Sequence, residues 1–349
     1  MAADNRTFNA WACTAKDKPL TKMQLELREW SEDCVELDVT HCGICGSDVH
    51  TMDSGWGPTE YPCVVGHEIV GVVKKTGKNV TNVKVGDRAG VGAQCSSCHK
   101  CQNCQEGNEN LCMNGFVGTY NGRWETNDKT FGGYADRWRG DYRFVFKVPD
   151  NMSSAIASTF FCAGVTTYAP LKRTNVNSSS VVGVMGLGGL GHYAVKWAKA
   201  MGAKVVGMSH NDKKRDVALE LGCDEYLNTS DKEAFGAYQR QMTHILCTGT
   251  SQDFDWMTYL KLITVNGHFI NVSMPEWNFP EISPFVFFSS QVYISGSAIG
   301  SPAEIEDMLE FAASHKVEPW IQTYKMDDVV KAIEDFRAGK PRFRIVLEN

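Results

Sequence analysis

The second half of the chain alternates apolar runs of strand length with segments of helical periodicity. Residues 181–186 form an apolar run that predicts a parallel strand buried on both faces. The next segment spaces its apolar side chains at helical intervals from Ala194 to Met201, and Gly202 supplies a stop. A second apolar run at 204–209 follows directly, so the pattern predicts a strand, a helix and a second strand.

The same alternation continues toward the C-terminus. A helical stretch is predicted at 253–263, among further strands at 224–228, 244–250, 267–273 and 291–297. Strands that alternate with helices are typical of a doubly wound parallel α/β sheet. We therefore predict that this half of the chain is a Rossmann-type domain.

Two more helices are predicted after the last of these strands. Ser301 and Glu304 have the spacing of a capping box, with Pro302 at the first helical position, so a helix is expected to continue through residue 315. A final helix is predicted at 326–339, and residues 342–349 then return the chain to its first domain. The residues before 181 show mainly loops and short strands.

Composition excludes several classes of protein. The 349 residues suffice for roughly two domains. The 35 Lys and Arg residues are outnumbered by 41 Asp and Glu, and this net charge of -6 argues against a nucleic-acid partner. No window contains the roughly 18 continuous apolar residues that a membrane span needs, and the N-terminal segment has no apolar secretion signal, so we expect a cytoplasmic location.

The first predicted strand runs into a glycine pattern that indicates a dinucleotide site. A single glycine triplet is weak evidence, but a G-x-G-x-x-G loop that opens a helix between two strands can cradle a pyrophosphate at the helix N-terminus. We expect the cofactor to contact Gly186, Gly188, Gly189, Leu190 and Gly191.

The end of the second strand predicts which dinucleotide binds. Ser209 stands where NAD-binding proteins place an acidic residue for the ribose hydroxyls. A basic run follows, and Lys214 is our first candidate to contact a 2'-phosphate, so the sequence favours NADP(H). Asp212 complicates this count of charges, and the run would also suit the solvated first turn of a helix.

Five of the 13 cysteines lie within eighteen residues, between Cys95 and Cys112. Four thiolates at C-x2-C spacing suit a closed tetrahedral zinc site, which holds a lobe in shape rather than performing chemistry. Spacing alone leaves two selections open. One uses Cys98, Cys101, Cys104 and Cys112, and the other includes Cys95 and omits a later member.

Two further segments carry a resemblance. Residues 41–50 read HCGICGSDVH and are followed by Trp56 and Gly57, while Gly66–Val80 fits the pattern G-H-E-x2-G-x5-G-x2-V. Over nearly its whole length the chain resembles the zinc-dependent medium-chain alcohol dehydrogenases, in particular the cinnamyl alcohol dehydrogenase group. The resemblance implies a mainly β, GroES-like catalytic domain with a structural-zinc lobe over 1–155 and 300–349, and an NADP-binding Rossmann domain over 156–299.

The same resemblance implies two zinc sites. Its spacing selects Cys98, Cys101, Cys104 and Cys112 for the structural zinc and leaves Cys95 spare. It assigns Cys45, His67 and Cys162 to a catalytic zinc with one open position, an arrangement for which alcohol dehydrogenase is a standard example. Glu68 is expected beside this zinc, and Asp48 is expected to orient His67 through its second ring nitrogen.

The remaining site residues are also implied by the resemblance. Ser47 and His50 match the positions of a proton relay. Ser209 and His210 would join Lys214 at the cofactor phosphate, Arg344 resembles a cofactor-phosphate arginine, and Thr166, Ser297 and Ile299 match positions near the nicotinamide. The segments that surround the substrate in this family contain Trp56, Phe116 and Trp124.

The sequence therefore predicts a zinc- and NADP(H)-dependent alcohol dehydrogenase with its active site in a cleft between two domains. It is expected to reduce aromatic, cinnamaldehyde-like and medium-chain aldehydes, and to form a homodimer through edge strands near 291–297. An NAD-dependent polyol dehydrogenase would share both halves but would usually have an acidic residue in place of Ser209. A non-enzymatic binding protein would keep the fold while losing ligands, yet all three predicted ligands of the catalytic zinc are present.

Overall fold

The computed structural model describes residues 5–349, which divide into two compact units. The first contains the described residues up to Val165 together with Gly300–Ser314 and Trp320–Asn349, and the second contains Thr166–Ile299 and His315–Pro319. The division follows Val165, ten residues after the boundary predicted from the sequence. The reason is that helix α3 (Ser154–Ser158) packs on strands of the first unit.

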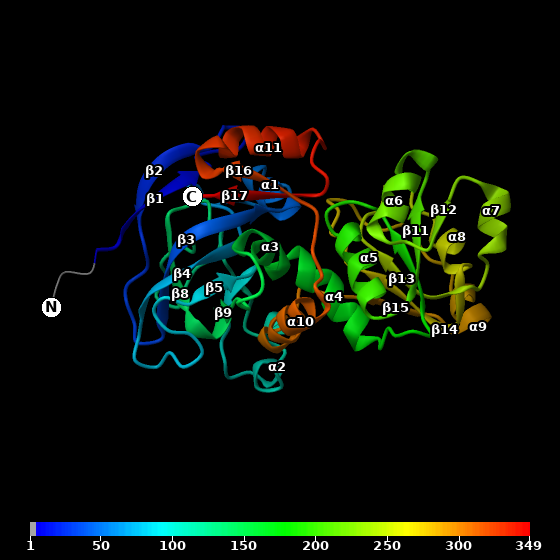
Figure 1. Cartoon of the computed structure of the whole chain (residues 1–349), viewed down its shortest axis with the longest axis horizontal. Helices are drawn as coiled ribbons and strands as arrows, with labels where there is room; N and C mark the ends of the chain where they lie inside the picture. Colours follow the sequence, from blue (N-terminus) through cyan, green and yellow to red (C-terminus); the bar gives the residue numbers. More distant parts are fainter. Residues whose placement is uncertain (1–4) are drawn as a thin grey trace. The chain divides into compact units, whose positions relative to one another are not determined.

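The first unit is built mainly on β-structure and also contains several helices (Figure 1). Its strands are β1 (Thr7–Ala12), β2 (Thr21–Glu26), β3 (Cys34–Ile44), β4 (Glu68–Thr76), β5 (Arg88–Val91), β6 (Gln94–Ser96), β7 (Val117–Gly118), β8 (Arg137–Asp141), β9 (Phe146–Lys147), β16 (Ile321–Lys325) and β17 (Arg344–Glu348). Its helices besides α3 are α1 (Gly46–Met52), α2 (Gln102–Gln105), α10 (Pro302–His315) and α11 (Val329–Arg337), with 3-10 turns at Glu109–Leu111, Tyr142–Phe144, Thr159–Phe161 and Met326–Asp328.

The central sheet of this unit has the order β16-β17-β3-β4-β5-β9, and β8 also pairs with β3. All pairs are antiparallel except β16 with β17. Strand β3 is largely buried, and residues of β3, β4, β5 and β17 belong to one apolar core. The C-terminal strand β17 joins this sheet, as the predicted return of the chain requires.

The second unit contains one parallel sheet with the order β12-β11-β10-β13-β14-β15. Its strands are β10 (Val181–Met185), β11 (Lys204–Ser209), β12 (Glu225–Asn228), β13 (Met242–Cys247), β14 (Ile263–Asn271) and β15 (Tyr293–Gly296). Its helices are α4 (Ala163–Arg173, which begins in the first unit), α5 (Gly191–Ala200), α6 (Arg215–Leu221), α7 (Lys232–Ala237), α8 (Trp256–Leu260) and α9 (Phe285–Ser290), with a 3-10 turn at Asp212–Lys214. Numbered from β10, this is the strand order 3-2-1-4-5-6 of a dinucleotide-binding fold, which confirms the predicted fold class.

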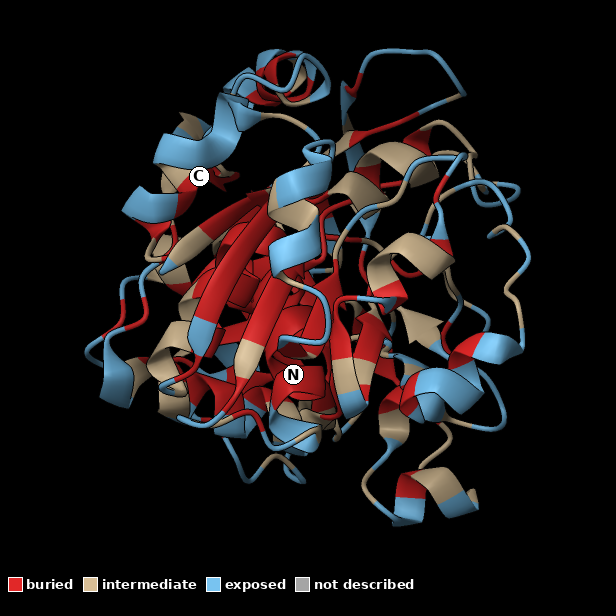
Figure 2. Ribbon diagram, turned by 90° about the vertical axis from the view of Figure 1, so that its right-hand side faces the viewer, coloured by how far each residue is buried: buried red, intermediate tan, exposed pale blue. Residues whose placement is uncertain are grey.

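Burial follows the apolar runs of the sequence. Val182, Val184, Val205 and Val206 are fully buried, and Figure 2 shows strands that consist largely of buried residues, with exposed residues in the loops around them. The predicted helix at 253–263 is wrong at its end, because Ile263 already begins β14. Within residues 5–349, no helix is both long and apolar enough to cross a membrane.

Candidate metal and dinucleotide sites

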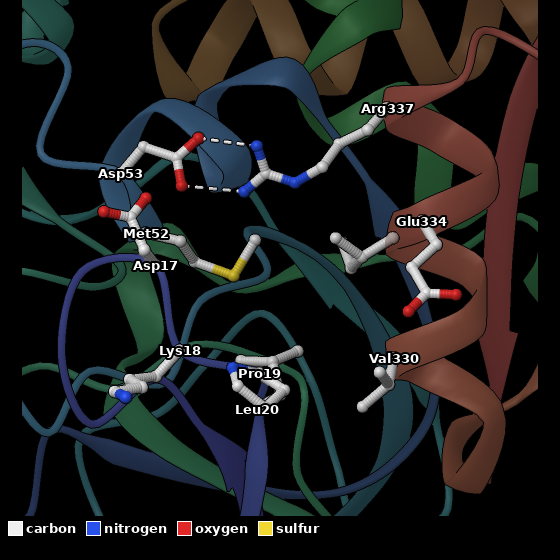
Figure 3. Close-up of a pocket in the computed structure, with 10 residues that line it drawn as sticks. Asp17, Lys18, Pro19, Leu20, Met52, Asp53, Val330, Glu334 and Arg337 are labelled. Carbon is white, nitrogen blue, oxygen red and sulfur yellow. Dashed lines mark hydrogen bonds and ion pairs between the residues drawn. The ribbon is translucent and has the colours of Figure 1, made fainter.

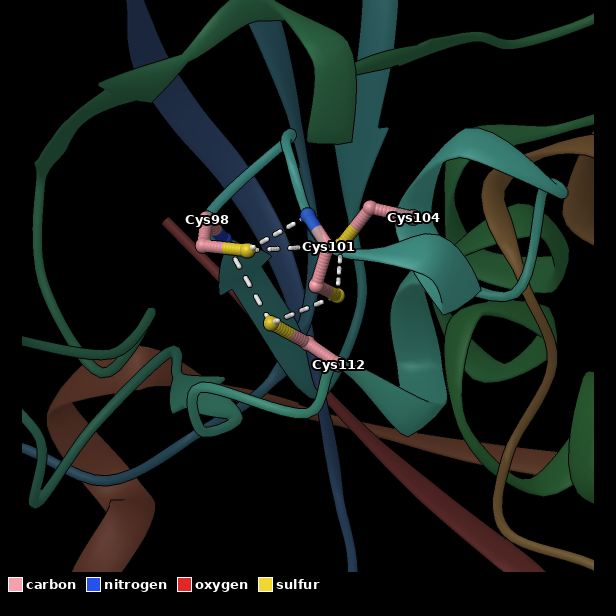
Figure 4. A group of neighbouring side chains, drawn as sticks. All are labelled: Cys98, Cys101, Cys104 and Cys112. Carbon is pink, nitrogen blue, oxygen red and sulfur yellow. Dashed lines mark hydrogen bonds between the residues drawn. The ribbon is translucent and has the colours of Figure 1, made fainter.

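Four cysteines gather on the loop between β6 and β7 (Figure 4). Cys101 is the N-cap of α2, Cys104 lies inside this helix, and Cys98 and Cys112 flank it on either side. The Sγ atoms of Cys101 and Cys104 are 3.5 Å apart, and those of Cys98 and Cys104 are 3.9 Å apart. Their four sulfurs lie within 4.8 Å of one another, so they have the separation that one tetrahedral ion requires.

Hydrogen bonds to sulfur make part of this cluster favourable for thiolates. The Lys100 N–H and the Asn114 amide lower the pKa of Cys98 to about 5. Backbone N–H groups of Cys104 and Met113 lower the pKa of Cys101, whereas burial raises that of Cys104 to about 12. Four sulfurs without a nitrogen or oxygen ligand suit a structural zinc ion.

Cys95 lies apart from this cluster. Its side chain is completely buried, its thiol donates to the Gly118 carbonyl at 3.4 Å, and burial raises its pKa well above the usual range. Of the two selections left open by spacing, the structure therefore brings together the one without Cys95.

A second cluster unites Cys45, His67, Glu68 and Cys162. Cys45 is the N-cap of α1, His67 directly precedes β4, Glu68 begins that strand, and Cys162 follows the 3-10 turn Thr159–Phe161. All four side chains are buried, and their ligand atoms lie within 4.8 Å of one another. The Sγ atoms of Cys45 and Cys162 are 3.8 Å apart.

The electrostatics of this cluster favour a cation. Burial opposes a charge on His67, but Cys45, Asp48 and Glu68 together raise its pKa to about 9. The Cys162 thiol lowers the pKa of Cys45 well below its usual value, against burial. His67 Nε2 and Glu68 Oε2 are buried without a hydrogen-bond partner among the described residues. Negative groups and unsatisfied ligand atoms facing one another fit a divalent metal ion.

Asp48 organises the backbone around this cluster. Its fully buried carboxylate accepts the Cys45 N–H at 2.8 Å, the Gly66 N–H at 3.1 Å and the Tyr134 hydroxyl at 2.9 Å. The His67 Nδ1 atom lies 3.9 Å from Asp48 Oδ1, which is longer than a hydrogen bond. Asp48 therefore fixes the loops that carry both ligands, rather than holding the His67 ring directly.

Arg344 was predicted to contact a cofactor phosphate, but in the structure it contacts Glu68. It begins β17, is 4% exposed, and forms an ion pair with Glu68 in the metal cluster. Burial raises the pKa of Glu68 to about 7, and Arg344 opposes this shift. Because its guanidinium is directed to Glu68, the contact supported by the structure is with the metal cluster rather than with a cofactor phosphate.

The predicted relay residues share helix α1. Ser47 and His50 are three residues apart and therefore lie on one side of the helix. Ser47 Oγ is 3.7 Å from Cys45 Sγ, and the His50 ring stacks on Trp56 with centroids 4.5 Å apart. One residue thus lies at the metal cluster, while the other lies against a partly exposed tryptophan.

The three aromatic residues predicted for the substrate have different environments. Phe116 is 50% exposed and Trp56 is 38% exposed, so both can contact a ligand. Trp124 is buried in the core beneath the Arg28 guanidinium, which lies 4.2 Å from its ring centroid. Because core atoms and Arg28 cover its ring, the structure gives Trp124 a packing role instead.

A pocket of about 300 Å³ opens beside the end of α1 (Figure 3). Leu20, Met52 and Ile333 form its apolar part, and the Asp53–Arg337 ion pair crosses its rim. No residue that lines it belongs to either metal cluster, so this pocket is separate from the candidate chemistry.

The glycine loop joins β10 to α5 at the carboxyl edge of the parallel sheet. Gly186 has a φ of 88°, and a Cβ on Gly191 would lie 1.8 Å from the Gly186 carbonyl oxygen. A Cβ on Gly188 would meet nothing within 4 Å, so the loop leaves open space at its middle glycine. Close packing at the ends and open space between them suit a pyrophosphate.

Basic groups lie beside this loop. Ser209 ends β11, His210 is exposed directly after it, and Lys214 Nζ donates to the Leu187 carbonyl at 2.8 Å. Asp212 forms an ion pair with Arg215 at 2.7 Å. The negative charge of Asp212 is therefore paired with Arg215, while the Lys214 ammonium lies at the glycine loop.

The predicted nicotinamide residues also belong to the second unit. Thr166 lies in α4 and is 8% exposed. Ser297 follows β15, with a buried hydroxyl that has no hydrogen-bond partner among the described residues, and Ile299 has a φ of 43°.

Sequence reasoning missed three residues that support these sites. Thr248 follows β13 and donates to the Gly186 carbonyl at 2.7 Å, a place that the strand-order rule could have indicated. Tyr120 stacks on His67 with centroids 5.2 Å apart, and Tyr134 binds Asp48. Neither tyrosine belongs to a local motif that would have identified it.

Comparison with known proteins is consistent with this geometry. Residues 31–150 match the family of the alcohol dehydrogenase GroES-like domain, and residues 189–314 match the zinc-binding dehydrogenase family. NADP-dependent alcohol dehydrogenase C 1 of Mycolicibacterium smegmatis is 40% identical over 344 residues, covering 98% of each chain.

Two solved structures are similar over nearly the whole chain. A cinnamyl alcohol dehydrogenase from Sorghum bicolor has a TM-score of 0.93 and 35% identity, covering 98% of this chain and 97% of its own. The cinnamyl alcohol dehydrogenase from Helicobacter pylori, complexed with NADP(H), has a TM-score of 0.90 and 32% identity, covering 98% of both chains.

Proposed function

The chain belongs to the zinc-dependent medium-chain alcohol dehydrogenases of the cinnamyl alcohol dehydrogenase-like group, and we propose that it uses NADP(H) to interconvert alcohols and aldehydes. The proposed substrates are aromatic, cinnamaldehyde-like aldehydes and medium-chain aldehydes, and reduction is the proposed direction. The observation that carries this proposal is the buried cluster of Cys45, His67, Glu68 and Cys162.

We assign the catalytic metal to Cys45, His67 and Cys162, with Glu68 beside it. A zinc ion bound there supplies a Lewis acid that polarises the substrate oxygen. Glu68 forms an ion pair with Arg344. This pairing supports a position for Glu68 beside the metal rather than as a permanent ligand. Cys98, Cys101, Cys104 and Cys112 are proposed to hold the second, structural zinc.

Ser47 and His50 are proposed to move the proton of the reaction. Ser47 donates its hydroxyl proton to the oxygen of the substrate as the aldehyde becomes an alcohol, and His50 restores that proton. The short distance from Ser47 to Cys45 and the stacking of His50 on Trp56 support this order.

NADP(H) is proposed to bind the glycine loop through its pyrophosphate, with Ser209, His210 and Lys214 at the 2'-phosphate. The bound nicotinamide supplies the hydride. Hydroxyl, imidazole and ammonium groups can bind a phosphate without the repulsion that an acidic side chain would introduce. The contact of Lys214 with the glycine loop supports its place near both phosphates.

The preference for aromatic aldehydes is supported by Trp56 and Phe116. Both lie in the first unit and expose part of their rings, which provides planar apolar surface for a conjugated substrate. We make no such proposal for Trp124.

We also propose a homodimer formed through β15. This strand ends the parallel sheet, and the side chains of Phe285, Phe288 and Tyr293 near it are 78%, 88% and 56% exposed. An unpaired strand edge beside exposed aromatic groups suits pairing with a second copy.

The assignment of the catalytic metal is tested by Cys162→Ala. We expect zinc content to fall from two ions to one per chain and aldehyde reduction to fall below about 1% of wild type, while NADPH affinity measured by fluorescence stays within about twofold. Cys247→Ala, another buried cysteine outside both clusters, is the control and should keep both ions. Two zinc ions and near-normal turnover in Cys162→Ala would refute the ligand assignment.

A further inference from the structure

A line of hydrogen-bonded side chains connects the structural cysteine cluster with the central sheet of the first unit. His99 Nε2 lies 2.9 Å from Asp141 Oδ2, and His99 Nδ1 lies 3.2 Å from Ser97 Oγ. The same Ser97 oxygen is 3.5 Å from Cys104 Sγ. Each separation permits a hydrogen bond, so the side chains form a continuous path from Asp141 to Cys104.

The far end of this path is firmly held. Asp141 is the last residue of β8, pairs with Cys34 in β3 and is 5% exposed. Its other carboxylate oxygen accepts the backbone N–H of Arg143 at 3.0 Å and the Arg143 Nε at 2.8 Å. These hydrogen bonds hold the Asp141 carboxylate in place even if the cysteine loop moves, so it can anchor His99.

His99 adopts a conformation that needs such support. Its φ is 54°, which lies in the left-handed region that residues with a Cβ adopt only at a cost in free energy. In this conformation its ring reaches both Asp141 and Ser97, and its backbone N–H also donates to Ser97 Oγ at 3.3 Å. The strained backbone thus brings all three interactions of one residue onto the path.

Cys104 differs from the other three cysteines in how its sulfur is supported. Cys98 Sγ accepts from the Cys101 N–H at 3.3 Å, Cys101 Sγ from the Met113 N–H at 3.4 Å, and Cys112 Sγ from the Cys98 N–H at 3.5 Å. The Cys104 sulfur instead lies next to the hydroxyl of Ser97, a residue that is only 3% exposed. A thiolate at Cys104 would accept the proton of this hydroxyl.

We propose that Asp141, His99 and Ser97 form a strut that positions Cys104 as a ligand and thereby retains the structural metal. Ser97 orients the sulfur, His99 orients Ser97, and Asp141 anchors His99 to β8. All three are positioning residues. The inference rests on the four-cysteine zinc site of the proposed function but is independent of the reaction at Cys45.

The test measures zinc release from the full-length protein. Cys162→Ala is used as the background, because it leaves the structural zinc as the one ion to follow. The rate of transfer to a chromogenic chelator is measured for Ser97→Ala and for His99→Ala. Loss of groups that orient metal ligands typically costs about 10–100-fold in metal affinity. We expect release to accelerate by about that factor in both variants, and Lys100→Ala, an exposed neighbour in the same loop, to release zinc at the background rate.

Two conservative variants test whether the path is continuous. In His99→Gln, the side-chain amide can take the place of His99 Nε2 and bind Asp141. In His99→Asn, the shorter amide can take the place of His99 Nδ1 and bind Ser97. Each should release zinc faster than the background protein and more slowly than His99→Ala, because each keeps one half of the path. Full retention by either variant would overturn the strut.

A purely structural role makes a different prediction. In that case Ser97→Ala and His99→Ala would lower the melting temperature of the zinc-free protein as much as that of the zinc-loaded protein, with an unchanged release rate. This result would overturn the proposal. Ser97→Ala changes a single buried atom, so it can be measured even if His99→Ala fails to fold. If the Cys162→Ala protein retains no zinc, the four-cysteine site itself is wrong, and the strut is overturned with it.

Discussion

Cys45, His67 and Cys162 each lie at the end of a helix, strand or 3-10 turn. At such a position the element fixes the backbone, while the side chain can still face residues from other parts of the chain. Their sequence positions span more than a hundred residues, and each has an ordinary explanation when taken alone. Their meeting depends on contacts that no local pattern reports, such as those that Asp48 makes with the Cys45 and Gly66 N–H groups. At the scale of the residue, the sequence indicated the ligands through a family pattern, whereas their shared burial became visible only in the fold.

The identity of residue 209 should control the choice of cofactor. Ser209→Asp places a carboxylate at the end of β11, where it repels a 2'-phosphate and can accept hydrogen bonds from ribose hydroxyls. We expect the ratio of kcat/KM for NADPH to kcat/KM for NADH to fall at least about tenfold, a change of about 1.4 kcal/mol. Ser179→Asp, in an exposed turn, is the control. An unchanged ratio in Ser209→Asp would contradict the phosphate site.

The elements with strong periodicity, which are those of the second unit and α10 of the first, were largely predictable from the sequence. The Ser301 capping box is confirmed, since the Ser301 N–H donates to Glu304 at 2.9 Å and α10 begins at Pro302. The helix predicted over 253–263 was too long, because apolar residues at the end of a short helix and at the start of a buried strand look alike in sequence. The ion pair of Arg344 with Glu68 was not predictable, since β17 and β4 are brought near each other only because both pair with β3.

Two glycines in helices should respond oppositely to alanine. Gly191→Ala would place a Cβ 1.8 Å from the Gly186 carbonyl oxygen, so α5 must shift from the glycine loop. We expect a loss of about 1–3 kcal/mol in the free energy of unfolding, together with weaker NADPH binding. Gly236→Ala in α7 meets nothing within 4 Å and should gain about 0.5–1 kcal/mol. Denaturant titration measures both changes, and equal stability of the two variants would refute the tight packing at Gly191.

The Asp53–Arg337 pair should make the packing of α1 with α11 dependent on pH. Hydrogen bonds from Arg337 at 2.6 and 2.7 Å lower the pKa of Asp53. A depressed carboxylate pKa stabilises the fold above the unfolded value of about 3.9, and this contribution is lost as the pH falls through the folded value. Because the pair is partly exposed, Arg337→Gln should cost only about 0.2–1 kcal/mol at pH 7.

The measurement is the free energy of unfolding of wild type and Arg337→Gln between pH 7 and pH 3. The difference between the two proteins should shrink below about pH 4, as Asp53 becomes protonated. Arg342→Gln, which removes an exposed arginine nearby in sequence, should show no such trend. A difference that stays constant down to pH 3 would argue against the linkage.

The whole chain combines one unit with two metal-ligand clusters and one unit with a dinucleotide loop. The number of units and the parallel sheet could be predicted from length and periodicity, whereas the β-rich unit required the resemblance because its strands are short and irregular. The oligomeric state is the least predictable property, since the local sequence of an edge strand such as β15 does not indicate what pairs with it.

Assembly is tested with an acidic group on the exposed edge. Tyr293→Asp in β15 should convert a dimer into a monomer in analytical ultracentrifugation, because burying an unpaired carboxylate at the interface is costly. Val265→Asp, at another exposed apolar position in the same unit, should remain a dimer. A monomeric wild-type protein would exclude the proposed dimer, and a dimeric Tyr293→Asp would place the interface elsewhere.

The central claim is zinc- and NADPH-dependent reduction of aldehydes, and one matched assay tests it most directly. Oxidation of NADPH and of NADH is followed with cinnamaldehyde and with a short aliphatic aldehyde, before chelation, after chelation and after zinc is added back. We predict rapid oxidation of NADPH with cinnamaldehyde, loss of this activity on chelation and recovery with zinc. A preference for NADH, or activity only in the oxidation of polyols, would contradict this account and would favour an NAD-dependent polyol dehydrogenase.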